Sequence, residues 1–184
     1  MSKIIEPTRT GPTVKRGQSR GDYCTPPEFL DAVQDRFGYV MFDLAATREN
    51  QVVGAGDPKG GPCYFGPDHE DPKKRDSLKQ DWSALRGVAW CNPPFDPLRP
   101  WLEKASEVSG RAGWTLLLCP ASVSTEWFAD LVHGRALVMP LRPRLTFVGE
   151  TDPYPRDLVL LAYGFGVSGF EPWRWSEGKR RSKR

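Results

Sequence analysis

An almost uninterrupted apolar run, Trp114-Thr115-Leu116-Leu117-Leu118-Cys119, lies in the second half of the chain. A strand with one face in water alternates apolar and polar residues, so this run predicts a strand buried on both faces. Such a strand needs a packed layer on each side of its sheet. The length of 184 residues suits one domain with a single core and leaves little room for a second.

Other short apolar stretches predict further strands, at 39–43, 88–91, 136–139, 145–148 and 158–163. Phe29, Leu30, Val33 and Phe37 recur at helical spacing, and two more helices are expected through 101–108 and 125–132. Thr25 and Glu28 have the spacing of a capping box, which predicts the start of the first helix. Strands that alternate with helices predict an α/β sandwich, with a mostly parallel central sheet and helices on both faces.

The two ends of the chain differ in composition from the part between them. Residues 1–21 contain Pro, Gly, Ser and basic residues without periodicity, which predicts a flexible arm. Residues 22–166 hold the predicted elements, and residues 167–184 form an aromatic and basic extension. The net charge is only +3, so the basic residues matter by being gathered at the ends. Short basic tails attract phosphates, but many of them only improve solubility.

Several classes of protein are not supported by the sequence. The four cysteines, Cys24, Cys63, Cys91 and Cys119, form no Cys-x-x-Cys pair, so a zinc finger or a redox motif is not indicated, and no metal is expected. The two histidines stand alone. No signal-peptide core and no run of about 20 apolar residues is present, which predicts a cytoplasmic protein.

The tetrapeptide Asn92-Pro93-Pro94-Phe95 directly follows the strand expected at 88–91. The Asn92 side-chain oxygen and the Pro93 carbonyl can both accept hydrogen bonds from one amino group. The two prolines stiffen the loop and lack amide donors, and Phe95 offers a flat face for stacking. Ligands of α/β sheets bind at the carboxyl ends of strands, where Asp43 is also expected. The motif therefore predicts a site for a planar aromatic amine, whose nitrogen attacks a methyl group held in line.

From 22 to 163, the chain resembles the phage-type DNA N-6-adenine methyltransferases, which are S-adenosylmethionine-dependent amino-methyltransferases. The segments that carry the resemblance are Asp22-Tyr23-Cys24-Thr25-Pro26-Pro27-Glu28, Phe42-Asp43-Leu44-Ala45-Ala46, Asp76-Ser77-Leu78, Trp90-Cys91-Asn92-Pro93-Pro94-Phe95 and Arg144-Leu145-Thr146-Phe147. The resemblance implies a Rossmann-like methyltransferase sandwich that methylates the N6 amine of a flipped adenine in DNA. A role in bacteriophage defence against restriction and modification is also implied. The usual Gly-rich cofactor loop is absent after Asp43, where Leu44-Ala45-Ala46-Thr47 stands instead.

Site residues follow from the same resemblance. Those assigned to catalysis are Asn92, Pro93, Pro94 and Phe95. Those assigned to S-adenosylmethionine are Thr25, Pro26, Asp43, Ala45, Asp76, Leu78 and Asn92. Arg142 and Arg144 are assigned to DNA on their charge, which suits phosphate better than a protein substrate. Three of these assignments have a simpler alternative: Asp43 can cap local amides, Asp76 can be a solvated charge, and Thr25 can cap a helix.

Other functions stay open at this stage. A methyltransferase acting on glutamine side chains also uses an Asn-Pro-Pro site, and a nucleic-acid-binding module can keep the fold without activity. Pro62-Cys63 resembles the nucleophile of cytosine-carbon methylases, but no partner carboxylate motif accompanies it. Methylation of the cytosine amine usually goes with Ser before Pro-Pro. The sequence does not indicate the DNA target, the preference for duplex or single strand, or the oligomeric state.

Overall fold

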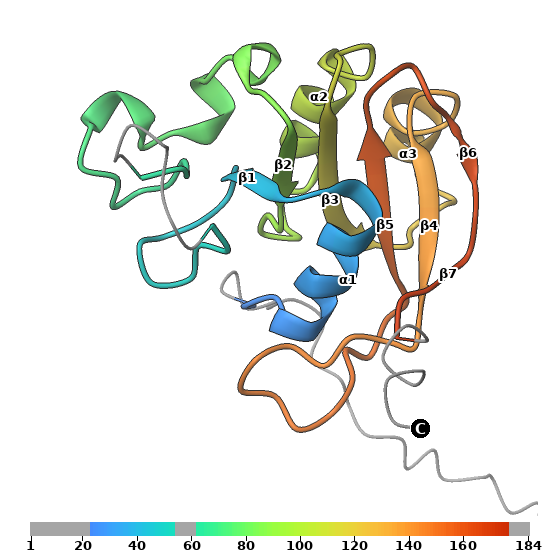
Figure 1. Cartoon of the computed structure of the whole chain (residues 1–184). Helices are drawn as coiled ribbons and strands as arrows, with labels where there is room; N and C mark the ends of the chain where they lie inside the picture. The colour runs from blue at the N-terminus through green and yellow to red at the C-terminus, as the bar shows by residue number, and fades with distance from the viewer. Residues whose placement is uncertain (1–22, 54–61, 177–184) are drawn as a thin grey trace, which may run out of the picture.

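A computed structural model of the chain describes residues 23–53 and 62–176 (Figure 1). Its centre is one seven-stranded sheet in the order β1-β2-β3-β5-β4-β6, with β7 also paired to β4. The strands are β1 (Val40–Asp43), β2 (Val88–Cys91), β3 (Trp114–Pro120), β4 (Leu137–Arg142), β5 (Leu158–Tyr163), β6 (Gly169–Phe170) and β7 (Trp173–Arg174). All residues of β5 and nearly all of β3 are buried, as expected of strands covered on both faces.

The sheet is mixed in direction. β1 pairs with β2 and β2 with β3 in parallel, whereas β5 is antiparallel to both of its neighbours, β3 and β4. The short strands β6 and β7 run parallel to β4. The α/β class expected from the sequence is confirmed. The two antiparallel ladders of β5 depart from the expected mostly parallel sheet, and the Rossmann-like classification stays a prediction.

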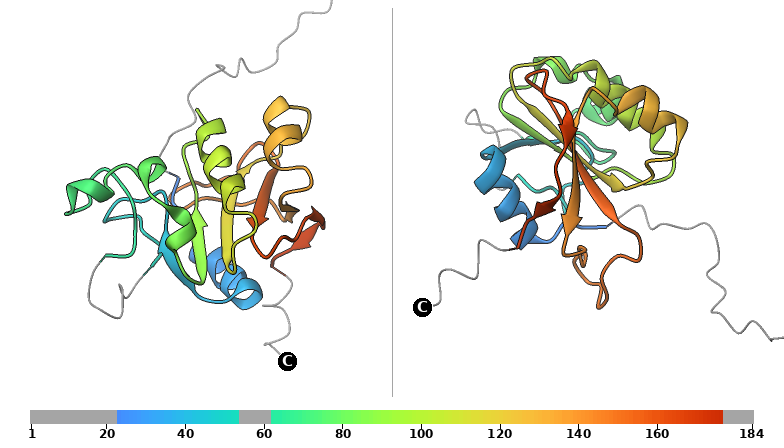
Figure 2. Two further views of the ribbon diagram at one scale, coloured as in Figure 1. Left: turned by 90° about the horizontal axis from the view of Figure 1, so that it is seen from above. Right: turned by 90° about the vertical axis from the view of Figure 1, so that its right-hand side faces the viewer.

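Helices cover both faces of the sheet, as expected (Figure 2). Phe29 and Val33 of α1 (Pro27–Phe37) pack on one face, against Val88, Trp90 and Leu116. On the other face, Leu102 and Ala105 of α2 (Arg99–Glu107) are buried, and α3 (Glu126–Leu131) packs beside them. Between β1 and β2 lie three short 3-10 helices, η1 (Pro72–Lys74), η2 (Ser77–Lys79) and η3 (Trp82–Ala84).

The start of α1 differs from the predicted capping box. Pro26 occupies the N-cap position, and no side chain caps the helix. The Thr25 hydroxyl accepts a hydrogen bond from Asn92 instead. The helix can begin without a side-chain cap because Pro27 lacks an N–H, so one fewer amide at its N-terminus needs a partner. The helix ends at Gly38, which follows Phe37 with φ 94°.

Three further segments show where the sequence pattern was incomplete. Residues 145–148 form a loop and not a strand, although Leu145 and Phe147 are buried as the pattern indicated. Residues 63–65 make only an isolated bridge, between Tyr64 and Asp43. The short strands β6 and β7 were not predicted. They lie in the region assigned to the extension 167–184. The arm 1–21 and the basic tail 179–184 lie outside the described residues, and the boundaries of the domain 22–166 remain a prediction.

The parallel pairing of β1 with β2 brings two polar residues to one edge of the sheet. Asp43, the last residue of β1, is in register with Trp90, and the Leu44 amide donates to the Trp90 carbonyl at 2.8 Å. Asn92 follows β2 directly.

Among the helices that the structure describes, none has the length and apolar character needed to cross a membrane.

Candidate active site

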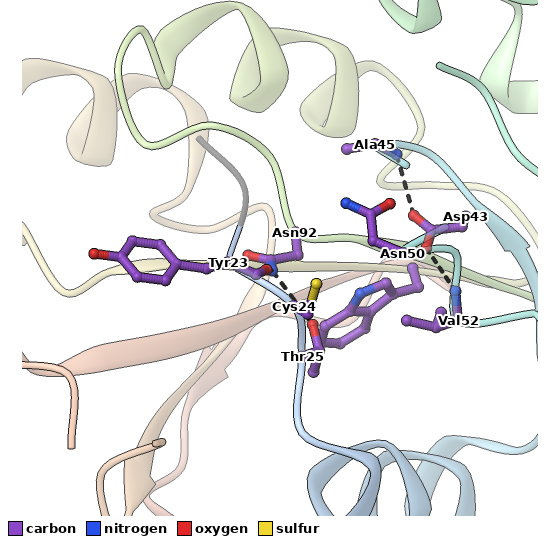
Figure 3. A pocket seen from close by; sticks show the side chains of 9 residues that line it. Tyr23, Cys24, Thr25, Asp43, Ala45, Asn50, Val52 and Asn92 are labelled. Atoms are coloured by element: carbon purple, nitrogen blue, oxygen red, sulfur yellow. Dashed lines mark hydrogen bonds between the residues drawn. The ribbon is translucent and has the colours of Figure 1, made fainter. Parts of the chain in front are cut away.

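Asp43 is a buried carboxylate, 3% exposed, at the carboxyl end of β1. Its two oxygens accept from backbone amides, one from Ala45 at 3.2 Å and the other from Val52 at 3.1 Å (Figure 3). Burial raises its pKa to about 6, and the two amide hydrogen bonds offset only part of that effect. Asp43 therefore caps local amides, and it also faces a pocket.

Asn92 is joined to the segment 23–25 by its side-chain amide. Its Nδ2 donates to the main-chain oxygen of Tyr23 at 2.6 Å and lies 3.3 Å from Oγ1 of Thr25. These residues lie 69 and 67 positions away in the sequence. Among the described residues no donor reaches Oδ1 of Asn92. The amide is thus held by its nitrogen, and its oxygen is left as an acceptor.

A small polar cavity of about 20 Å³ lies beside these two residues, and we call it the carboxylate pocket. Figure 3 shows Asp43 of β1, Cys24, Thr25 and Asn92 gathered around it, whereas the ring of Tyr23 points away. The residues that line it are Tyr23, Cys24, Thr25, Asp43, Ala45, Asn50, Val52, Trp90 and Asn92. Of the residues assigned to the cofactor, Thr25, Asp43, Ala45 and Asn92 meet here, whereas Pro26 is buried behind them as the N-cap of α1.

A larger cavity of about 450 Å³, the apolar pocket, adjoins the first at Ala45 and Asn50, which line both. Phe65, Pro94 and Trp101 supply much of its apolar wall. The predicted residues Asp76 and Leu78 lie at its margin. The complete lining is Ala45, Ala46, Thr47, Asn50, Phe65, Gly66, Pro67, Arg75, Asp76, Ser77, Leu78, Pro94 and Trp101. The volume of the apolar pocket falls in the range of cavities that hold small molecules, whereas the carboxylate pocket by itself has space for little more than one water molecule.

Asp76 has a local structural partner as well as a place in this lining. Its Oδ1 accepts from the Leu78 amide at 3.1 Å and so caps η2, and its Oδ2 lies 3.0 Å from the Lys79 ammonium. The hydrogen bond from Lys79 is the main cause of a lowered pKa. The side chain is 48% exposed, so this ion pair contributes little to stability. The carboxylate is ionised at neutral pH and remains an acceptor at the rim of the apolar pocket.

Phe95 belongs to a cluster of four aromatic rings, which we call the aromatic cluster. Its ring lies 6.5 Å from that of Tyr23, at an interplanar angle of 30°, and 5.7 Å from that of Tyr154 in an edge arrangement. Phe147 stacks on Tyr23 at 4.7 Å. Pro93 is buried and Pro94 half-buried, so the loop brings a half-buried aromatic ring next to Asn92. Such a surface suits a planar ring.

Arg142 and Arg144 lie at the same edge of the sheet, because β4 runs in the same direction as β2. Arg142 ends β4 and is exposed. Arg144 is also exposed, but its guanidinium is 2.8 Å from the Asp157 carboxylate and donates to the Pro155 carbonyl at 3.3 Å. Since the Arg144 guanidinium is engaged by Asp157 and Pro155, Arg142 is the more available cation of the two.

Several residues that line the site were not assigned to it from the sequence. Asn50 lines both pockets, and its Oδ1 accepts from the Thr47 amide at 2.6 Å, which holds the turn after β1. The other unassigned residues are Tyr23, Phe65, Trp101, Phe147 and Tyr154. The resemblance to the family had pointed to the segments that hold Tyr23 and Phe147. No signal in the sequence singles out Trp101 or Tyr154, since their role depends on long-range packing.

The alternative chemistries gain no geometric support. Cys63 is buried and is absent from the lining of both pockets. In the part of the chain that the structure describes, no three His, Cys, Asp or Glu side chains come close enough to hold a metal ion.

Comparisons with known proteins agree with this geometry. Residues 13–157 match the model of a family described as DNA N-6-adenine-methyltransferase (Dam). A protein named DNA N-6-adenine-methyltransferase, from Escherichia phage T1, is 26% identical over 147 residues, which are 80% of this chain. The matched part is 55% of that protein, so the chain spans about half the length of the curated relative it matches.

Proposed function

Since the chain belongs to the DNA N-6-adenine-methyltransferase family, we propose that it transfers a methyl group from S-adenosylmethionine to the N6 amine of an adenine in DNA. The observation that supports this best is the state of Asn92. Its amide nitrogen is engaged by the segment 23–25, and its oxygen is left as an acceptor beside two adjoining pockets.

The two pockets suit the two ends of S-adenosylmethionine. When bound, this cofactor supplies a methyl group on a positively charged sulfur. The carboxylate of Asp43 in the first pocket suits the charged ammonium of the amino-acid end. The apolar pocket suits an adenosine ring, with Leu78 against the ring and Asp76 accepting from its exocyclic amine. Ala45 lies where the pockets adjoin, so it leaves room for a ligand that spans both.

Asn92 and Pro93 would hold the target amine. Oδ1 of Asn92 and the carbonyl of Pro93 each accept one N–H of the N6 amine, which turns the nitrogen lone pair toward the methyl group. Phe95 stacks on the base and fixes its plane. Because Pro93 and Pro94 have no amide N–H, neither of these two positions offers a backbone donor that competes for these acceptors.

The adenine has to leave the base stack to reach this site. Flipping costs about a few kcal/mol, and stacking on an aromatic ring returns roughly 1–3 kcal/mol per base. The two energies nearly cancel, so contacts to the DNA backbone must supply the rest. Arg142, exposed at the same edge of the sheet, is the foremost candidate for such a contact, and Arg144 is the second.

The experiment is transfer of a labelled methyl group to DNA by the wild type and by Asn92→Ala. The substitution removes an acceptor needed in the transition state, so transfer should fall by roughly 100-fold or more. S-adenosylmethionine should still raise the melting temperature of both proteins, because the lining around Asp43 is kept.

Two results count against the proposal. Full turnover by Asn92→Ala means that the amide does not hold the amine. Thermal stabilisation of neither protein by S-adenosylmethionine means that the pockets belong to another ligand, as in a binding module without activity.

A further inference from the structure

The Asn92 amide can serve as the acceptor for a base amine in only one of its two orientations. A rotation of 180° about the last side-chain bond exchanges Oδ1 and Nδ2. In the exchanged orientation, two N–H donors would face the N6 amine, which is itself a donor. Transfer by Asn92 therefore needs a device that selects one orientation.

The segment 23–25 distinguishes the two orientations through the Tyr23 carbonyl, whereas the Thr25 hydroxyl, which can accept or donate, adds a second partner for the amide. The main-chain oxygen of Tyr23, 2.6 Å from Nδ2, cannot donate. Oγ1 of Thr25 is 3.3 Å from the same nitrogen, and Thr25 is only 7% exposed. An exchanged amide would set Oδ1 against the Tyr23 carbonyl oxygen. It would also leave the part-buried Tyr23 carbonyl without the Asn92 donor, which is costly away from solvent.

The segment 23–25 is itself fixed from two sides. On one side, the Cys24 carbonyl accepts from the Val148 amide at 3.1 Å. On the other, Pro26 begins α1, and its carbonyl accepts from the Phe29 amide at 3.0 Å. The two acceptors are therefore in place before any base arrives.

We propose that Thr25 is a positioning residue: the main-chain carbonyl of Tyr23 selects the orientation of the Asn92 amide, and the Thr25 hydroxyl holds the amide nitrogen there, so that the amide oxygen stays turned toward the target amine. This inference rests on the proposed function. It gives the Thr25 hydroxyl a role in the catalytic step, beyond the cofactor contact and the helix cap expected from the sequence.

The test is Thr25→Val, which keeps the shape of the side chain and removes its oxygen. With saturating cofactor and DNA, kcat should fall roughly tenfold, the effect of losing one buried hydrogen bond. KM for S-adenosylmethionine should change less than about twofold. Thr25→Ser keeps the hydroxyl and should restore most of the loss in kcat. The matched control is Thr115→Val, because the buried Thr115 hydroxyl makes no hydrogen bond among the described residues and lies away from the site.

A second measurement needs no activity. In the wild type, the side-chain amide protons of Asn92 should exchange with water more slowly than those of Asn50, whose amide nitrogen has no partner among the described residues. Thr25→Val should speed the exchange at Asn92, and Thr115→Val should leave it unchanged. Asn92→Ala identifies the signals by their loss.

The possible failures can be told apart. A wild type that methylates no DNA overturns the proposed function. A wild type that does so, with an unchanged kcat in Thr25→Val or a rise in the KM for S-adenosylmethionine alone, overturns the positioning role. Equal exchange at Asn92 and Asn50 in the wild type also overturns it, whether or not Thr25→Val folds.

Discussion

Asp43 combines a structural and a proposed functional task in one carboxyl group. Its oxygens satisfy the Ala45 and Val52 amides, which close the turn after β1. Burial nevertheless raises its pKa from 3.8 to about 6. The folded state therefore binds a proton more tightly than the unfolded state, and the free energy of unfolding should decrease as pH rises from about 4 to about 6. Above pH 6 the carboxylate is charged and ready for a cation.

This pKa leads to a prediction for cofactor binding. Below pH 6 the carboxyl of Asp43 is protonated and cannot pair with the ammonium of S-adenosylmethionine. The affinity should therefore fall by up to about tenfold per pH unit between pH 6 and pH 5. Titration calorimetry at several pH values measures this.

The matched variant is Asp43→Asn, which has no ionisable group at this position. It should bind S-adenosylmethionine more weakly at pH 7 and show a flatter pH profile. An equally steep profile in the variant would show that another group controls the affinity.

At the scale of single residues, the sequence was most informative for polar residues at the carboxyl ends of strands. Asp43 and Asn92 were expected at one edge of the sheet, and parallel pairing of β1 with β2 confirms that placement. The capping role of Thr25 was wrong. A hydroxyl next to a helix start can bond to the helix or to a distant group, and only the folded chain shows that Asn92, 67 residues away, is the partner.

Among the structural elements, the edge of β1 shapes the apolar pocket. The Asp43 amide donates to the Cys63 carbonyl at 2.8 Å, and the Phe65 amide donates to the Asp43 carbonyl at 2.9 Å. Gly66 follows, and a Cβ there would lie only 1.6 Å from the Ala46 carbonyl oxygen. The close approach of these two backbones therefore requires glycine at 66.

Gly66→Ala should consequently displace the segment from β1. The expected loss of stability is about 1–3 kcal/mol, typical of overpacking, with weaker binding of S-adenosylmethionine because Gly66 lines the apolar pocket. Chemical denaturation measures the first effect. Gly110→Ala is the matched control, since nothing lies within 4 Å of a Cβ at 110. Equal stability of the two variants would contradict the role given to Gly66.

The errors in the predicted elements have a common physical origin. Leu145 and Phe147 alternate with more exposed residues, a pattern shared by a strand and by an extended loop packed on the core. Whether such a segment joins a sheet depends on a free neighbouring edge, which is a long-range property. The same holds for β6 and β7, each of two residues, which exist because the outer edge of β4 is available. The antiparallel direction of β5 also depends on long-range strand pairing, so local sequence patterns could not predict it.

At the scale of the whole molecule, the proposed DNA surface lies at the sheet edge that holds Asn92 and Arg142. Arg142→Ala should weaken DNA binding similarly for all sequences. It should also reduce the slope of log affinity against log salt by about 0.9, the value for one lost phosphate contact. Fluorescence anisotropy over a series of salt concentrations measures both.

Arg86→Ala is the matched control for this prediction. Arg86 is exposed and precedes β2, so it lies at the opposite end of that strand from Asn92. It should leave affinity and slope unchanged. Equal effects of the two substitutions would mean that DNA does not lie along the proposed edge.

The most direct test of the proposed function is the chemical identity of the methylated product. DNA is incubated with the protein and S-adenosylmethionine, digested to nucleosides and separated by mass spectrometry, with Asn92→Ala in parallel. We predict N6-methyladenine from the wild type and none above background from the variant. Methyl groups found only on cytosine, or only on protein glutamine, would contradict the assignment of Asn92 and Pro93 to an adenine amine.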